Sequence, residues 1–445
     1  MLYYGNSFEI RQTSMNTAKP TLNRPLKQLL AIASALLLGG CQLVDMARFS
    51  FANASATHQW PDPQQTTSVP FRLVDNHIIL PVSVNGSAPL DFVLDSGAAA
   101  TVIMDSRATR ALHLQMAGEL SVSGTGTGPH PTARIVPGVS TTVGGLSLDG
   151  QAAIFLPLDA VPFFNELDDV YFDGVIGAPF FERFTIEIDH DQRLVSFSEP
   201  TVTAQRTRDD AGDWREVALQ IDAALPYLTA RVDPGEGPPI TLKLLVDTGF
   251  RGTLSLTPSS SDELSQPTVY FESVSQGLSG DVPSRVAMVN SLSLASYCLR
   301  DLPVRYAQAG GESQNGANGI LGNEVLQQFN LVFDYARERL LLAPSQRPAL
   351  PVEADRSGLL IRPHTRGGVV RRIAPDSSAQ AAGLQVGDII TAFDGTAITP
   401  DNIGELKRAL SSSRDTVSLC WQSTGAQHCG DLALASRFRR QPATS

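Results

Sequence analysis

Two acidic residues far apart in the chain end the same short pattern. An apolar run leads into Asp95-Ser96-Gly97, and another leads into Asp247-Thr248-Gly249. Two carboxyl groups held close together cannot both ionise readily, so such a pair shares one proton. The ionised member can take a proton from water while its protonated partner donates to a developing oxyanion. Asp-Ser/Thr-Gly also suits an ordinary turn, and in that alternative both aspartates only shape turns.

A second repeated pattern lies downstream of each aspartate and indicates a duplicated domain. Gly174-Val175-Ile176-Gly177 corresponds to Gly319-Ile320-Leu321-Gly322. In both copies apolar residues at helical spacing follow, and then an alternating strand pattern that ends in aspartate. The features come in the same order and differ only in loop length, as duplicated domains do. Two unrelated turns are therefore a poor explanation of the paired aspartates.

These motifs resemble the retropepsin-like aspartic proteases, with both halves in one chain. The resemblance covers residues 69–200 and 214–345. It implies a mostly β fold, in which two tandem retropepsin-like β-barrel halves form a pepsin-like pseudo-dimer. It also implies that Asp95 and Asp247 are the catalytic dyad at the floor of a cleft. Because the pair titrates as a unit, neither aspartate is assigned as acid or base.

The neighbours of the two aspartates are expected to support them. Gly97 and Gly249 allow tight turns that bring the backbone close to the carboxyl groups. By resemblance, the hydroxyls of Ser96 and Thr248 hydrogen-bond across the interface between the halves. Phe250 departs from the family, which has a small residue there. Its ring would narrow the cleft, shift the choice of substrate or signal lost activity.

Two glycine-rich stretches, residues 123–128 and 276–280, are candidates for flaps that cover a bound peptide. Dense glycine favours a mobile hairpin or loop, and the family uses flaps of this kind. Plain flexible loops explain both stretches equally well. The flap candidates are Gly124, Gly126, Gly277 and Gly280.

The C-terminal region carries Ala381-Ala382-Gly383-Leu384 and, shortly after, Val386-Gly387-Asp388-Ile389-Ile390. These stretches resemble the PDZ domains of bacterial envelope proteases, and we expect such an α+β domain at 357–436. PDZ domains bind an extended peptide, often a C-terminus, as an added strand and hold its carboxylate on backbone N–H groups. Leu360 stands where many have a second glycine, so a packing role is the alternative. The implied peptide-binding residues are Gly358, Leu359, Leu360 and Ile361.

The N-terminus is typical of a targeting segment. Basic residues precede an apolar run that is too short to span a bilayer and ends at Leu38-Gly39-Gly40-Cys41. This ending resembles the lipobox of bacterial lipoproteins. The resemblance implies a signal peptide over 1–41, lipidation of Cys41 and a location in the cell envelope, on the outer membrane facing the periplasm. An ordinary secretory signal is the alternative, and Met15 is an alternative start to Met1.

The remaining segments are expected to connect these domains. Residues 42–68 are polar and contain prolines, which is typical of a flexible tether. Residues 201–213 and 346–356 are expected to be linkers, and 437–445 a tail.

Cys420 and Cys429 flank Thr424-Gly425 in the C-terminal domain. If that dipeptide forms a hairpin turn, the two cysteines face each other on neighbouring strands. A disulfide is then feasible and fits an oxidising compartment, and two reduced, packed thiols are the alternative.

Several function classes are disfavoured by composition and motif. The chain of 445 residues has a net charge of −11 without a long basic block, which argues against nucleic acid as a partner. Its histidines are scattered, so we expect no metal and no organic cofactor. The sequence therefore predicts a lipid-anchored aspartic endopeptidase whose partners are polypeptide substrates or C-terminal peptides. The alternative is a catalytically inactive, protease-derived scaffold that binds peptides.

Overall fold

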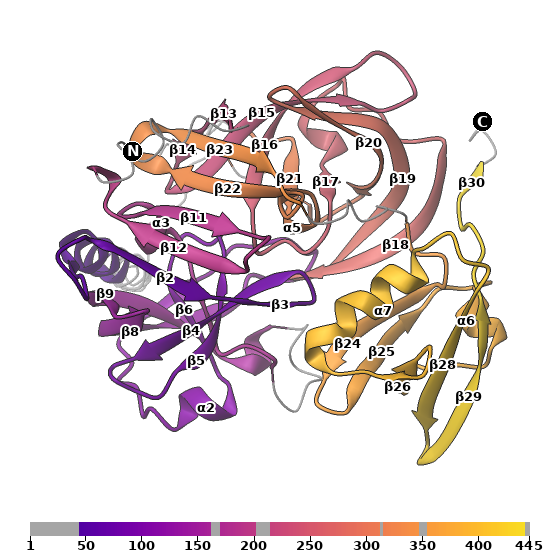
Figure 1. The fold of residues 1–445 in the computed structure, drawn as a ribbon, viewed down its shortest axis with the longest axis horizontal. Helices are drawn as coiled ribbons and strands as arrows, with labels where there is room; N and C mark the ends of the chain where they lie inside the picture. The colour runs from indigo at the N-terminus through magenta and orange to yellow at the C-terminus, as the bar shows by residue number, and fades with distance from the viewer. Residues whose placement is uncertain (1–43, 162–169, 202–213, 312–314, 347–353, 441–445) are drawn as a thin grey trace, which may run out of the picture.

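The computed structural model describes residues 44–161, 170–201, 214–311, 315–346 and 354–440. Strands dominate these ranges, as the mostly β expectation required. Each repeated half forms its own nine-stranded sheet, a six-stranded sheet joins the halves, and the C-terminal domain has a separate six-stranded sheet (Figure 1). The expected signal peptide with Cys41, and most of both expected linkers, lie outside the described residues.

The sheet of the first half is built so that a parallel pair of strands ends at Asp95. Strand β5 lies beside β10, with Leu94 opposite Ile176. Both faces of β4 and β5 are buried: Leu80 and Leu94 lie in the main core, and Ile79 and Val93 pack into a second buried cluster on the opposite face. The strands are β1 (Thr57–Gln59), β3 (Arg72–Val74), β4 (His77–Val84), β5 (Leu90–Leu94), β6 (Val102–Met104), β7 (Glu119–Ser121), β8 (Thr132–Val143), β9 (Leu146–Leu156) and β10 (Gly174–Ile176).

The second half repeats this plan, as the duplicated motifs predicted. A parallel pair, β16 and β21, ends at Asp247, which lies opposite Gly322. The strands of this sheet are β14 (Gln220–Asp222), β15 (Leu225–Asp233), β16 (Ile240–Asp247), β17 (Leu254–Leu256), β18 (Val269–Gly277), β19 (Gly280–Leu294), β20 (Tyr297–Ala307), β21 (Gly319–Gly322) and β30 (Arg439–Arg440).

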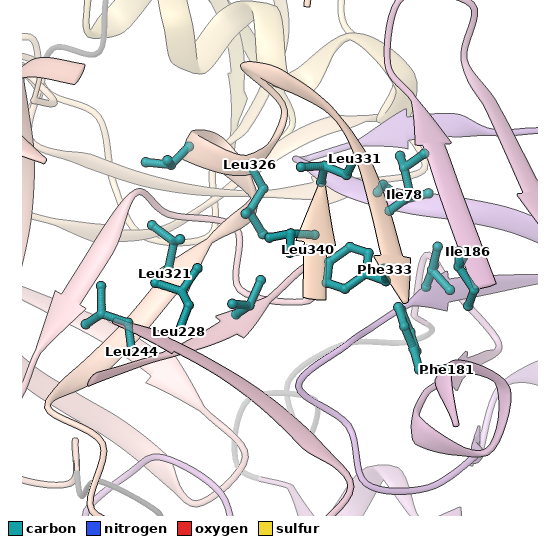
Figure 2. Close-up of a cluster of buried hydrophobic side chains, with 14 of the residues drawn as sticks. Ile78, Phe181, Ile186, Leu228, Leu244, Leu321, Leu326, Leu331, Phe333 and Leu340 are labelled. Carbon is teal, nitrogen blue, oxygen red and sulfur yellow. The ribbon is translucent and has the colours of Figure 1, made fainter. Parts of the chain in front are cut away.

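The six-stranded sheet ties the halves together. Its two central strands, β11 and β22, come from different halves and pair antiparallel, with Ile186 opposite Phe333. Figure 2 shows Phe181, Ile186 and Phe333 in one buried cluster, and the rings of Phe181 and Phe333 are 5.2 Å apart. The strands are β2 (Thr66–Pro70), β11 (Thr185–Asp189), β12 (Leu194–Ser198), β13 (Arg215–Ala218), β22 (Phe329–Asp334) and β23 (Arg339–Pro344).

The C-terminal domain packs its own core and presents β24 and α7 toward the two halves (Figure 1). Strand β24 is at the edge of its sheet. The expected hairpin turn at Thr424-Gly425 is present, and a disulfide joins Cys420 to Cys429. The elements are β24 (Leu359–His364), β25 (Gly367–Ile373), α6 (Ser378–Ala381), β26 (Ile389–Phe393), β27 (Thr396–Ala397), η4 (Pro400–Asn402), α7 (Ile403–Leu410), β28 (Thr416–Ser423) and β29 (Ala426–Ala433).

Short helices complete the two halves. Two of them, α3 and α5, directly follow the Gly-ending strands of the repeat and match the predicted helical spacing. They and the other short helices are α2 (Arg107–Arg110), η1 (Leu158–Ala160), α3 (Ala178–Phe181), η2 (Pro258–Ser260), α5 (Asn323–Leu326) and η3 (Tyr335–Arg337). No helix in the described part of the chain is long and apolar enough to cross a membrane.

Two expectations about the ends of the chain are wrong. Within the expected tether, 42–68, residues 44–55 are helical, and β1 and the start of β2 follow. The helix is held because Phe49 and Ala52 pack against a buried cluster that contains Leu120. Within the expected tail, 437–445, strand β30 pairs with β18 of the second half. The first error arises because apolar residues of the segment pack against the first half, and the second arises because main-chain pairing orders a short polar segment.

Candidate active site

Two buried hydroxyl groups connect the two aspartate loops, residues 95–97 and 247–249, across the interface between the halves. The Ser96 N–H donates to Thr248 Oγ1 at 3.0 Å, and the Thr248 N–H donates to Ser96 Oγ at 3.1 Å. Ser96 Oγ also donates to the Val246 carbonyl, and Thr248 Oγ1 to the Leu94 carbonyl, both at 2.7 Å. Both side chains are fully buried. The exchange is symmetric, so each loop fixes the other.

This connection brings Asp95 and Asp247 together. The two carboxyl groups lie close enough for each to shift the pKa of the other. The Gly97 N–H donates to Asp95 Oδ1 at 2.7 Å, and the Gly249 N–H donates to Asp247 Oδ1 at 2.8 Å. A Cβ atom on Gly97 would lie 2.6 Å from Asp247 Cγ, and one on Gly249 would collide with Asp95. The two loops therefore require glycine at both positions.

The electrostatics of the pair favour a retained proton. Burial raises the pKa of Asp95, and backbone N–H groups oppose this rise. Burial, followed by the charge of Asp95, raises the pKa of Asp247 well above its usual range. The pair therefore holds a proton at a pH where two isolated carboxyl groups would have lost theirs.

A buried histidine hydrogen-bonds to the loop that carries Asp247. His77 Nε2 lies 2.9 Å from the Gly249 carbonyl, and the Tyr171 hydroxyl lies 2.8 Å from His77 Nδ1. Burial lowers the pKa of His77 to about 3 and raises that of Tyr171 to about 12. Both are therefore neutral, so His77 donates through Nε2 and accepts the Tyr171 proton at Nδ1. Neither residue was predicted, because no local pattern marks them.

The second repeated motif packs against the aspartate loops. The Ala178 N–H donates to the Ala98 carbonyl at 2.8 Å, and the Asn323 N–H donates to the Phe250 carbonyl at 2.7 Å. The Phe250 ring is half-buried and lies over Gly252, since a Cβ there would be 2.7 Å from Phe250 Cζ. The ring thus lines the cavity wall and does not separate the two carboxyl groups.

Both flap candidates line the same cavity as the aspartates and contact each other. The Ser279 N–H donates to the Thr125 carbonyl at 2.8 Å, and the Gly128 N–H donates to the Ser279 carbonyl at 2.7 Å. Gly126 donates to the Gly310 carbonyl at 2.7 Å, Gly124 lies against Leu278, and Gly277 and Gly280 pair at the tip of the β18–β19 hairpin. Opening and closing of these loops stays a prediction.

The cavity has a volume of about 1190 Å³ and extends from the aspartates to the C-terminal domain. All four predicted peptide-binding residues, from Gly358 to Ile361, line it. At the start of this stretch, the Gly358 N–H donates to Asp355 Oδ2 at 2.9 Å, and the Leu359 N–H donates to Ser357 Oγ at 3.1 Å. Within the described ranges, no three His, Cys, Asp or Glu side chains come together as metal ligands would.

Comparisons with known proteins agree with both resemblances. Residues 80–180 match the aspartyl protease family, and residues 369–419 match the PDZ domain family. No curated protein matches the sequence. Among solved structures, the aspartic proteinase from Irpex lacteus is similar, with 12% sequence identity and a TM-score of 0.40 over 64% of this chain and 99% of that chain. The chain therefore contains an aspartyl protease domain followed by a PDZ domain.

Proposed function

We propose that this protein is an aspartic endopeptidase that uses Asp95 and Asp247 to hydrolyse peptide bonds. The observation that carries the proposal is the pair of neighbouring carboxyl groups, held by the reciprocal bonds of Ser96 and Thr248 in one cavity. A scaffold that only binds peptides would not need two aspartates at that spacing or glycines that admit their carboxyl groups.

In the proposed reaction, a water molecule lies between the two carboxyl groups. The ionised carboxylate takes a proton from this water, whose oxygen attacks the carbonyl carbon of the peptide bond. The protonated carboxyl group donates its proton to the developing oxyanion. When the tetrahedral intermediate collapses, the C–N bond breaks, the amine nitrogen receives a proton from the pair, and one hydroxyl group of the intermediate returns a proton to the pair as its carbonyl forms. The products are a carboxylic acid and an amine, and the pair again holds one proton.

The pair must hold one proton, so we expect a bell-shaped dependence of kcat/KM on pH. Activity falls at low pH because both carboxyl groups are protonated, and it falls at higher pH because the shared proton is lost. Since burial raises the pKa of both aspartates, the alkaline limb should lie above the ordinary range of a carboxyl group. The measurement is cleavage of an unfolded protein by the full-length protein in mild detergent, from about pH 4 to about pH 7. No cleavage anywhere in that range, with peptide binding intact, would favour the inactive scaffold.

We further propose that Cys41 anchors the chain to the outer membrane, with the catalytic domain in the periplasm. The lipobox-like sequence supports this location, and the Cys420–Cys429 disulfide suits an oxidising compartment. The PDZ domain would recruit or position polypeptide substrates, because it borders the same cavity as the aspartates.

A further inference from the structure

The two halves differ at a turn that lies beside the aspartate loops. In the first half, Asp75-Asn76-His77 form the turn between β3 and β4 and the first residue of β4. In the second half, Ala223-Ala224-Leu225 take the same place between β14 and β15. The turn residues have φ angles of 51° and 66° in the first half and of 50° and 68° in the second. The following strands pair in the same register with the strands that lead to the aspartates, so His77 and Leu225 occupy equivalent positions.

His77 reaches from this turn into the other half. Its Nε2 lies 2.9 Å from the Gly249 carbonyl, and a carbonyl can only accept, so Nε2 carries the proton. Nδ1 then accepts from the Tyr171 hydroxyl at 2.8 Å, which fixes this tautomer. Leu225 has an apolar side chain and can donate no such bond to the loop of Asp95. His77 therefore breaks the symmetry between the two aspartate loops.

One peptide group connects His77 to a catalytic carboxyl group. The carbonyl that His77 binds belongs to the peptide group between Gly249 and Phe250. The N–H of the same group donates to Asp247 Oδ1 at 2.8 Å. Because a peptide group is planar, holding its carbonyl also fixes the direction of its N–H. A hydrogen bond to the carbonyl further polarises the group and strengthens the N–H as a donor.

This chain of two hydrogen bonds favours the ionised form of Asp247. Burial and the charge of Asp95 raise the pKa of Asp247, and the backbone N–H groups of Phe250 and Gly249 oppose this rise. An N–H that donates to a carboxylate stabilises the negative charge. If the Phe250 N–H is held less firmly, the pKa of Asp247 rises further.

The turn that carries His77 is held by contacts that do not involve the imidazole ring. Asn76 Nδ2 donates to the Arg251 carbonyl at 3.0 Å, and Asn323 Nδ2 donates to the Asn76 carbonyl at 2.6 Å. Arg251 also forms an ion pair with Asp75. A substitution of the ring should therefore leave the turn in place.

The groups that act on His77 keep their charge over the pH range in which the pair is expected to work. Burial lowers the pKa of His77 itself to about 3, so it stays neutral. Burial raises the pKa of Tyr171 to about 12 and lowers that of Arg362 to about 9. Although burial opposes ionisation, neighbouring cations hold the pKa of Asp75 below its usual range, and the pKa of Arg251 is raised beside Asp75.

Three further groups are close to the aspartate loops. Burial raises the pKa of Tyr335 well above its usual range, so Tyr335 stays neutral. Glu182 and Glu324 lie at the two short helices that follow the Gly-ending strands. Burial raises the pKa of both, and that of Glu324 reaches about 7. These groups are the same in every variant compared below, so a difference between variants reports on the aspartate pair.

We propose that His77, held by Tyr171, is a positioning residue for the catalytic pair and stabilises the ionised form of Asp247 through the Gly249–Phe250 peptide group. The inference rests on the proposed hydrolase function. It means that the two halves, although duplicated, contribute unequally to the pair.

The test compares the dependence of kcat/KM on pH for two substitutions of one side chain. His77→Leu removes the donor and leaves the side chain that the second half has at this position. His77→Gln keeps an N–H donor, because the glutamine amide nitrogen can take the place of Nε2. The full-length variants are assayed in mild detergent from about pH 4 to about pH 7. We expect the profile of His77→Leu to move to higher pH by about half a unit or more, and that of His77→Gln to move by less than about 0.2 of a unit.

Two other variants complete the series. Tyr171→Phe removes the hydroxyl that holds the His77 tautomer, so its profile should move in the same direction by a smaller amount. If His77→Leu fails to fold, this variant decides. The matched control is His428→Leu, an exposed histidine of the C-terminal domain that does not line the cavity. Its profile should coincide with that of the unmodified protein.

The outcomes separate this inference from the proposed function. Lower activity of His77→Leu with an unmoved profile overturns the inference, because a purely structural role gives that result. Equal displacement by His77→Leu and His77→Gln also overturns it, because the donor is then not the cause. If the unmodified protein cleaves nothing, the hydrolase proposal fails, and the infrared signal of the protonated carboxyl pair decides instead. That signal should persist to higher pH in His77→Leu than in the unmodified protein, and identical signals overturn the inference.

Discussion

Replacing Asp95 or Asp247 by asparagine is expected to lower kcat/KM for peptide hydrolysis by at least about a thousandfold. Asparagine has nearly the same shape as aspartate but can neither ionise nor share the proton, so water is no longer activated. The reciprocal bonds of Ser96 and Thr248 do not involve the carboxyl groups, so both loops should keep their geometry. Peptide binding should therefore survive. The measurement is cleavage by each variant, alongside peptide binding by fluorescence anisotropy.

The matched control is Asp376→Asn in the C-terminal domain. Asp376 is exposed and has a positive φ of 52°, a conformation that asparagine adopts well. This variant should cleave as the unmodified protein does. Retention of full activity by either dyad variant would show that the observed cleavage comes from another site or another protein.

Replacing Asp75 by asparagine is expected to destabilise the protein by about 3–5 kcal/mol. Burial alone would raise the pKa of Asp75, but Lys407, Arg251 and Arg362 hold that pKa well below its usual range. The Asp75 carboxylate is therefore ionised in the folded protein, and its loss removes the carboxylate that Lys407 and Arg251 both contact. Because the folded-state pKa is lowered, this stabilisation is present above the unfolded-state pKa and is lost as the pH falls.

The measurement for Asp75→Asn is thermal and urea unfolding, with the Asp376→Asn variant as the control. The additional change Lys407→Met removes one of the cations that contact Asp75, so the double variant should regain part of the lost stability. Asp75 lies in the first half, and Lys407 and Arg362 lie in the C-terminal domain. We therefore expect the contact between these two parts to loosen first. Unchanged unfolding of Asp75→Asn would show that the three cations do not depend on this carboxylate.

The two aspartates of the candidate site could be predicted from the sequence because the same motif occurs in both halves of the duplicated domain. Asp95 and Asp247 stand out only when their two motifs and the two Gly-ending strands are aligned. Spacing also predicted the short helices after those strands and the Thr424-Gly425 hairpin. These features depend on nearby residues, and local patterns record them.

The supporting residues could not be predicted because folding alone brings them together. His77 reaches Gly249 from the other half, and Tyr171 reaches His77 from beyond the β8–β9 hairpin. The cluster around Asp75 draws residues from three separate regions of the chain. Long-range contacts also order residues 44–55 and strand β30, for which the sequence predicted a flexible tether and a tail. No pattern of local spacing encodes such contacts.

The central claim is that Asp95 and Asp247 share one proton, and infrared difference spectroscopy tests it most directly. The spectrum of the full-length Asp247→Asn variant is subtracted from that of the unmodified protein over a pH series. We predict the signal of one protonated carboxyl group that persists well above the ordinary carboxyl pKa of about 4, because burial raises the pKa of both aspartates. If that signal has already vanished by about pH 5, as it would for two independent carboxyl groups, the shared-proton account is wrong.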